Sequence, residues 1–84
     1  MSSTAKTIKV EYCAVLREQR GLSHETISTE ADTVDLLYRE LAKLHAFRLS
    51  PERMRAAVNG SFVALSQCLE GGETVVFIPP VAGG

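Results

Sequence analysis

The residues of this sequence whose types suggest chemistry lie at its carboxyl end, in the run Pro79-Pro80-Val81-Ala82-Gly83-Gly84. Glycine has no Cβ, so a Gly83-Gly84 tip can pass along a narrow channel in a partner enzyme. We expect Gly84 to be the natural last residue, with its free α-carboxylate as the reacting group. The pattern predicts a thin tail that projects from a globular body and carries one reactive group at its tip.

The stretch before this tip predicts how the tip is held. Thr74–Ile78 is apolar at nearly every position, which favours a strand in the centre of a sheet or against a partner. Proline fixes φ and donates no backbone hydrogen bond, so Pro79 and Pro80 should end the strand pairing. We expect residues 79–84 to form an extended, flexible tail that reaches on the order of 20 Å.

The first half of the chain predicts two strands and a helix. Residues 7–13 alternate between apolar and polar side chains, the pattern of a strand with one buried face. Residues 14–20 favour one or two helical turns that end at Gly21, and residues 22–30 contain a second strand, antiparallel to the first. Thr33 is a good N-cap for a helix from Val34 to about Phe47. Its expected buried face follows spacings of three and four residues: Val34, Leu37, Leu41 and Leu44, widened by Leu36.

The second half predicts three further strands. Ser50-Pro51-Glu52 marks a break, after which Met54–Val58 predicts a strand. Asn59-Gly60 is a strong two-residue hairpin signal, and residues 61–65 form its return strand. The order β-β-α-β-β-β predicts an α+β fold with one main helix packed on a mixed sheet of four to five strands. We expect one domain over residues 1–84, with residues 1–6 as a disordered leader.

Composition excludes several classes of function. Charged residues make up 23% of the chain and the formal net charge is −1, which disfavours a nucleic-acid or membrane partner. The amino terminus has no apolar stretch that would act as a signal peptide. Two cysteines suit a reduced, cytoplasmic chain better than a disulfide scaffold. We therefore expect a cytoplasmic protein.

The cysteines and histidines offer little further chemistry. Cys13 and Cys68 either carry a persulfide or serve as small apolar residues, and the second reading is the more common one. His24 and His45 lack the short spacing of zinc ligands, so we expect no metal site and no bound cofactor.

Four stretches together resemble one known family. They are Ala14-Val15-Leu16-Arg17-Glu18 with Gly21; Thr33-Val34, Leu36-Leu37 and Leu41; Ala57-Val58-Asn59-Gly60; and the ending Val75–Gly84. The ending, Phe-(apolar)-Pro-Pro-Val-x-Gly-Gly, is the most specific. The chain is similar to the ubiquitin-like β-grasp family, and within it to the small subunits of molybdopterin synthase, the MoaD-type sulfur carriers. One departure is the turn Gly71-Gly72-Glu73-Thr74, where the family usually has Asp-Gly-Asp-Glu.

The resemblance implies a specific chemistry at Gly84. A carboxylate is a poor electrophile, so an E1-like activating enzyme uses ATP to adenylate it. A sulfur donor protein then displaces AMP and leaves a glycyl thiocarboxylate. The thiocarboxylate donates its sulfur to cyclic pyranopterin monophosphate in the large synthase subunit, and two transfers build the dithiolene of molybdopterin.

The resemblance also implies where partners bind. The large subunit would assemble with this chain as a hetero-oligomer, a heterotetramer in the expected form, while Gly83 threads its channel. The residues expected to dock are Phe77, Ile78, Pro79, Pro80, Val81 and Ala82. Of the first two, we expect one side chain to face the core and the other a partner.

Three alternatives remain open at this point. The chain would serve as a sulfur carrier for thiamine or another thio-cofactor, although thiamine-type endings lack the Pro-Pro pair. It would instead modify proteins, with Gly84 in isopeptide bonds to lysines, as ubiquitin does. The third alternative is a plain binding module with an inert tail, for which deletion of Gly83 and Gly84 would leave the activity unchanged.

Overall fold

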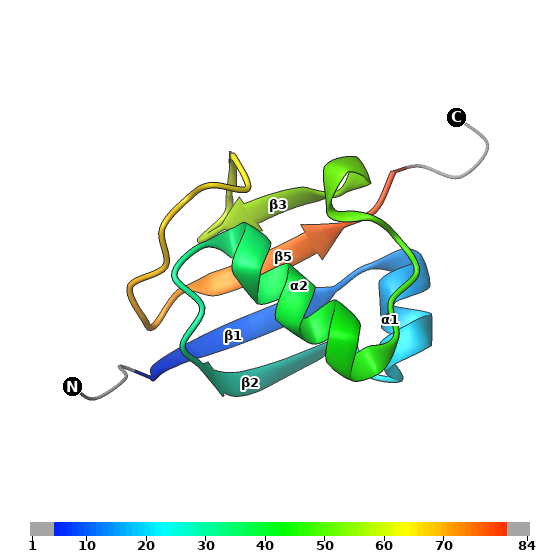
Figure 1. Cartoon of the computed structure of the whole chain (residues 1–84), viewed down its shortest axis with the longest axis horizontal. Coiled ribbons are helices and arrows are strands. Elements are labelled where there is room, and N and C mark those ends of the chain that lie inside the picture. Colours follow the sequence, from blue (N-terminus) through cyan, green and yellow to red (C-terminus); the bar gives the residue numbers. More distant parts are fainter. Residues whose placement is uncertain (1–4, 81–84) are drawn as a thin grey trace.

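The protein is described by a computed structural model that covers residues 5–80, so residues 1–4 and 81–84 lie outside the description. The expected leader therefore lies largely outside it, as do Val81, Ala82, Gly83 and Gly84. In chain order the elements are β1 (Lys6–Tyr12), α1 (Ala14–Arg20), β2 (His24–Thr29), α2 (Val34–His45), the 3-10 helix η1 (Pro51–Arg53), β3 (Arg55–Val58), β4 (Ser61–Val63) and β5 (Thr74–Ile78). Figure 1 shows α2 lying across one face of the sheet.

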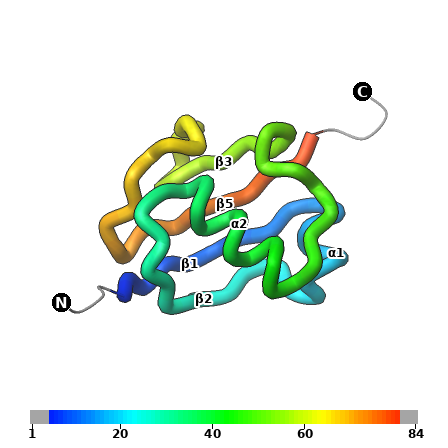
Figure 2. The backbone as a smooth tube through the Cα atoms, viewed as in Figure 1, coloured from blue at the N-terminus to red at the C-terminus, as the bar shows by residue number. Residues whose placement is uncertain are grey.

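The five strands form one mixed sheet in the order β2-β1-β5-β3-β4. β5 pairs in parallel with β1 and antiparallel with β3, so the last strand in sequence is the central one. The backbone path in Figure 2 shows β5 running between these two neighbours. The expected central position of the last strand is thus confirmed, and with it the α+β class.

The main helix begins where the sequence predicts it. The Thr33 side chain accepts a hydrogen bond from the Leu36 N–H at 3.2 Å. The first helical N–H groups are also paired: Val34 donates to the Gln67 carbonyl at 3.0 Å and Asp35 to the Leu65 carbonyl at 2.8 Å. The loop after β4 thus caps α2, because it satisfies donors that have no partner within the helix.

The buried face of α2 differs from the prediction in part. Val34, Leu37, Tyr38 and Leu41 are buried, whereas Leu36 and Leu44 are 48% and 67% exposed. Leu36 lies about 200° around the helix from Val34, which places it on the far side of the buried face. Leu44 lies about 80° from Val34 in the last turn, at the edge of that face. The helix also ends at His45 rather than near Phe47, because Ala46 adopts the left-handed conformation with φ 58°. Phe47 then returns to the core in a position that continued helix would not give it.

An aromatic cluster joins α2 to β1 and β5. The Tyr38 ring lies 5.4 Å from that of Phe77 and 6.0 Å from that of Phe47, and Tyr12 meets Phe47 edge-on at 5.7 Å. The Tyr38 hydroxyl donates to the Leu49 carbonyl at 2.6 Å, so its polar atom has a partner. This cluster fixes the helix on the half of the sheet from which β5 leaves.

The hairpin between β3 and β4 confirms the Asn59-Gly60 signal. Both residues have positive φ, 50° and 89°, as a type I′ turn requires. Asn59 also holds the start of β5: its N–H donates to the Thr74 carbonyl at 2.9 Å, and its Oδ1 accepts from the Thr74 N–H at 3.0 Å. The flanking strands are shorter than predicted, since Met54 donates to Pro51 within η1 and β4 ends at Val63.

The turn before β5 is closed by the side chain of Glu73. The Glu73 carboxylate accepts hydrogen bonds from the Glu70 and Gly71 N–H groups at 2.8 and 2.6 Å. Partial burial raises the pKa of Glu73, but these bonds outweigh it and hold the pKa below its usual value. Among the residues described, no helix is long and apolar enough to cross a membrane.

A matched pair of substitutions tests which phenylalanine belongs to the core. Phe77 is fully buried, so Phe77→Ala should lower the free energy of unfolding by about 3–5 kcal/mol. Phe62 is 72% exposed, so Phe62→Ala should change it by no more than about 0.5 kcal/mol. Urea unfolding of both variants measures this, and equal losses would contradict the assigned core.

Candidate functional site

The tail leaves the folded body at Ile78, Pro79 and Pro80, called here the tail root. β5 pairs with β3 as far as Ile78, and neither proline belongs to a strand, as predicted. Pro79 is buried and Pro80 is exposed. The point of departure is therefore fixed by the sheet on one side and by packing around Pro79 on the other.

A groove that contains the tail root lies against the start of α1. Its walls are Cys13, Ala14, Val15, Glu18, Ile78, Pro79 and Pro80, and its surface is mostly apolar. The turn from β1 into α1 passes through Ala14, whose φ of 52° lies in the left-handed region. That turn brings the half-buried Cys13 and the exposed Val15 beside the prolines.

α1 is held in place by a charged pair with a tyrosine. The Arg20 guanidinium donates two hydrogen bonds to the Glu25 carboxylate, at 2.8 and 2.9 Å, and the Tyr12 hydroxyl donates a third at 2.7 Å. The bonds from Arg20 hold the pKa of Glu25 below its usual value. Burial, and then the bond to Glu25, raises the pKa of Tyr12. The cluster ties α1 to β1 and β2, and so fixes one wall of the groove.

The sheet face that α2 does not cover carries a row of apolar side chains. Strand register places Val76 of β5 beside Ala57 of β3, and Ala57 beside Phe62 of β4. Ile78 lies two residues after Val76 on the same face of β5, opposite Arg55 of β3. We call Ala57, Phe62, Val76 and Ile78 the outer face. Ala57 is only 9% exposed yet is no part of the main core cluster, because its neighbours on the outer face cover it.

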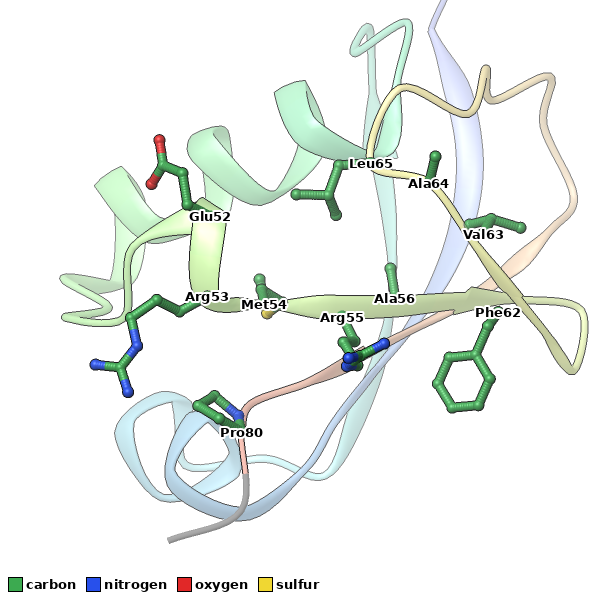
Figure 3. A pocket seen from close by; sticks show the side chains of 10 residues that line it. All are labelled: Glu52, Arg53, Met54, Arg55, Ala56, Phe62, Val63, Ala64, Leu65 and Pro80. Carbon is green, nitrogen blue, oxygen red and sulfur yellow. The ribbon is translucent and has the colours of Figure 1, made fainter. Parts of the chain in front are cut away.

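A second hollow adjoins the tail root on the β3 side. Figure 3 shows its lining, which includes Met54, Phe62, Leu65 and Pro80 together with Glu52, Arg53 and Arg55. The tail root thus lies between an apolar groove at α1 and a hollow of mixed apolar and charged character at β3.

The predicted docking residues separate in this geometry. Phe77 points into the core, so its predicted role as a docking residue is wrong, because no part of the side chain reaches a partner. Ile78 is half-buried on the outer face, and the expected division between these two residues follows from the alternation of a strand. Pro79 and Pro80 form the tail root. Gly83, Gly84, Val81 and Ala82 lie outside the described residues.

Several residues of this site were not predicted from the sequence. Cys13, Val15, Ala57, Phe62 and Val76 gather there only when the strands pair. The exposure of Phe62 could have been predicted, because an aromatic side chain in a short edge strand after a hairpin turn has little opportunity for burial. Cys68 is exposed in the loop that caps α2, where it forms a β-bridge with Thr33. Within residues 5–80, no group of three or more His, Cys, Asp or Glu side chains is arranged to hold a metal ion.

Comparison with known proteins identifies the family. The ThiS family model matches residues 10–84, which is most of the chain including its Gly-Gly ending. The chain belongs to the ThiS family.

One curated protein is similar in sequence to this chain over nearly its full length. The chain is 34% identical over 80 residues to the molybdopterin synthase sulfur carrier subunit of Escherichia coli, covering 92% of this chain and 99% of that protein. This identity confirms the resemblance to the molybdopterin synthase small subunits.

Two solved structures confirm the ubiquitin-like β-grasp fold. SAMP1 of Haloferax volcanii has a TM-score of 0.73 at 22% identity, with 93% of this chain and 99% of that chain covered. The complex of subunits 1 and 2 of the molybdopterin-converting factor of Helicobacter pylori contains a chain with a TM-score of 0.61 at 20% identity, with 93% and 99% covered.

The pH dependence of stability tests the cluster of Arg20, Glu25 and Tyr12 that holds α1 in place. Because the folded pKa of Glu25 is depressed, its contribution should be complete above the ordinary glutamate pKa of about 4.3 and disappear as the pH falls through the folded value. We expect Glu25→Gln to cost about 1–2 kcal/mol at pH 7 and less at pH 3, which lies below the ordinary glutamate pKa of about 4.3. Urea unfolding at both pH values measures the difference, with Glu18→Gln as the control, since Glu18 is an exposed glutamate on α1. A pH-independent loss would contradict the assignment.

Proposed function

We propose that this chain is the sulfur carrier and small subunit of a molybdopterin synthase. The observation that carries the proposal is the 34% identity to the E. coli sulfur carrier subunit over nearly the full length of both proteins. Gly84 is the residue that carries the sulfur, and Gly83 lets the tip pass through the channel of the acceptor enzyme. The chain is a sulfurtransferase subunit whose acid-base groups and substrate pocket belong to its partner.

The proposed chemistry proceeds in three steps. An E1-like enzyme joins the Gly84 carboxylate to the AMP moiety of ATP and releases pyrophosphate, which converts a poor leaving group into a good one. The terminal sulfur of a persulfide on a sulfur donor protein displaces AMP and forms an acyl disulfide, and a second thiol then reduces the S–S bond, which leaves a thiocarboxylate on Gly84 and a disulfide on the donor side. The thiocarboxylate sulfur attacks cyclic pyranopterin monophosphate, and hydrolysis returns the carboxylate for another cycle. ATP is consumed by the activating enzyme and is not held by this chain.

The fold supports this division of labour. β5 is hydrogen-bonded on both edges, and Phe77 packs against Tyr38 one residue before the tail root. A tail that starts from such a strand has a fixed origin. The rigid body therefore positions the tail, and the partner positions the reacting atom.

The outer face and the tail root are the proposed contact with the large subunit. Phe62 is the largest exposed apolar side chain in the row, and a cluster of exposed apolar residues beside a functional segment is typical of a protein interface. The H. pylori structure is a complex of subunits 1 and 2 of the molybdopterin-converting factor, and one of its chains shares this fold. We propose the same pairing here, as a heterotetramer, in the cytoplasm where ATP and reduced thiols are available.

A protein modifier is the second candidate, because an adenylated glycine also reacts with lysine amines. The fold does not separate the two functions, since the small archaeal modifier SAMP1 shares it. The sequence favours the carrier, at 34% identity to the E. coli subunit against 22% to SAMP1. A modifier predicts a ladder of covalent conjugates in cell extract, which the carrier does not.

Intact mass tests the activation step. After incubation with ATP, a sulfur donor and the host's activating enzyme, we expect a shift equal to one oxygen replaced by one sulfur, located in the C-terminal peptide. A chain without Gly84 is the matched control and should keep its mass. An unchanged mass of the full chain, with the enzyme active on a control carrier, would contradict the proposal.

Extension of the tail tests the need for a free terminus. One alanine added after Gly84 should abolish sulfur transfer, because adenylation requires the terminal carboxylate of Gly84. The unfolding midpoint should not change, since the added residue buries nothing in the core. A fully active extended chain, shown by mass to be untrimmed at the end of the assay, would refute this requirement.

A further inference from the structure

The hollow at the tail root carries positive charge on its outer side. Arg55 lies opposite Ile78 in the register of β3 and β5, and Arg53 is two residues earlier, in η1. Both side chains are exposed, and both line the hollow together with Phe62 and Pro80. We call Arg53 and Arg55 the basic rim.

Glu52 is the one acidic residue that lines the hollow, and its carboxylate does not pair with the arginines of the basic rim. The Glu52 carboxylate is largely exposed and lies 4.0 Å from the Arg39 guanidinium of α2. Figure 3 shows its carboxylate directed away from Arg53 and Arg55, both of which lie on the side of Pro80. Among the ion pairs of residues 5–80, none includes Arg53 or Arg55. The rim is therefore available to an external negative charge.

Two other charged residues of the uncovered sheet face lie on β1, and Glu18 lies on the α1 side of the tail root. Glu11 is in register with Val76, and Lys9 is in register with Thr74 on the same strand. These two residues have opposite charges two positions apart, so they largely offset each other at a distance. The basic rim is thus the net charge that a partner meets on the β3 side of the outer face.

The geometry points to a protein partner that brings an acidic side chain to this rim. We propose that Arg53 and Arg55 select the docking partner by pairing with one or more carboxylates, beside the apolar contact made by Phe62 and Ile78. The inference rests on the proposed function and names the large synthase subunit as the partner concerned. Gly84 is four residue steps beyond Pro80, about 13 Å in an extended chain, so the rim determines specificity and takes no part in the chemistry.

Charge pairs at the edge of an interface act mainly on the association rate, and salt screens them. The double variant Arg53→Glu, Arg55→Glu should therefore bind the purified large subunit at least about tenfold more weakly than wild type at low salt. The two dissociation constants should converge in about 0.5 M NaCl, where the Debye length falls toward a few ångströms. Phe62→Ala should weaken binding at both salt concentrations, because its contribution is apolar.

Lys43→Glu is the matched charge reversal, since Lys43 is exposed on α2, which covers the other face of the sheet. Binding by surface plasmon resonance, with the unfolding midpoint of each variant, measures all of these effects. Arg55→Gln provides a milder variant and should give an intermediate loss at low salt. Binding by the double variant that equals that of Lys43→Glu at low salt would overturn the inference, as would an equal loss at high salt. If the wild-type chain does not bind the large subunit at all, the proposed function fails, and this inference with it.

Discussion

The pairing of β5 with β1 on one edge and β3 on the other is the constraint on which this structure depends. The last strand of a chain is often an edge strand, but here it occupies the centre of the sheet. It cannot shift along its axis without breaking both ladders and withdrawing Phe77 from the aromatic cluster around Tyr38. Ile78, the first residue of the tail root, is consequently held by the sheet itself.

The alternation of β5 assigns different tasks to its two faces. Val75 and Phe77 are fully buried beneath α2, while Val76 and Ile78 belong to the outer face. Stability and docking therefore depend on different side chains of the same five-residue strand. A substitution on one face leaves the other largely unaffected, so a loss of partner binding can be separated from a loss of folding.

Much of this arrangement is predictable from local sequence. The Thr33 cap, the Asn59-Gly60 turn and the proline stop after Ile78 each act within a few residues, and all three are confirmed. The exposure of Leu44 was missed, because the left-handed Ala46 ends the helix and lets Phe47 fill the core instead. The outer face was missed because it joins residues of three strands, and its existence depends on a register that local patterns do not contain. Phe77 and Ile78 are both apolar, so composition could not say which of them faces the core.

The central claim is that sulfur leaves this chain from Gly84 and from no other atom. The direct measurement uses the chain prepared with a radiolabelled thiocarboxylate at Gly84 and mixed with the purified large subunit and cyclic pyranopterin monophosphate. Our account predicts that the label moves to the pterin product and that the chain returns to its unmodified mass. Label retained on the chain, or equal product from a chain with an unmodified carboxylate, would contradict it.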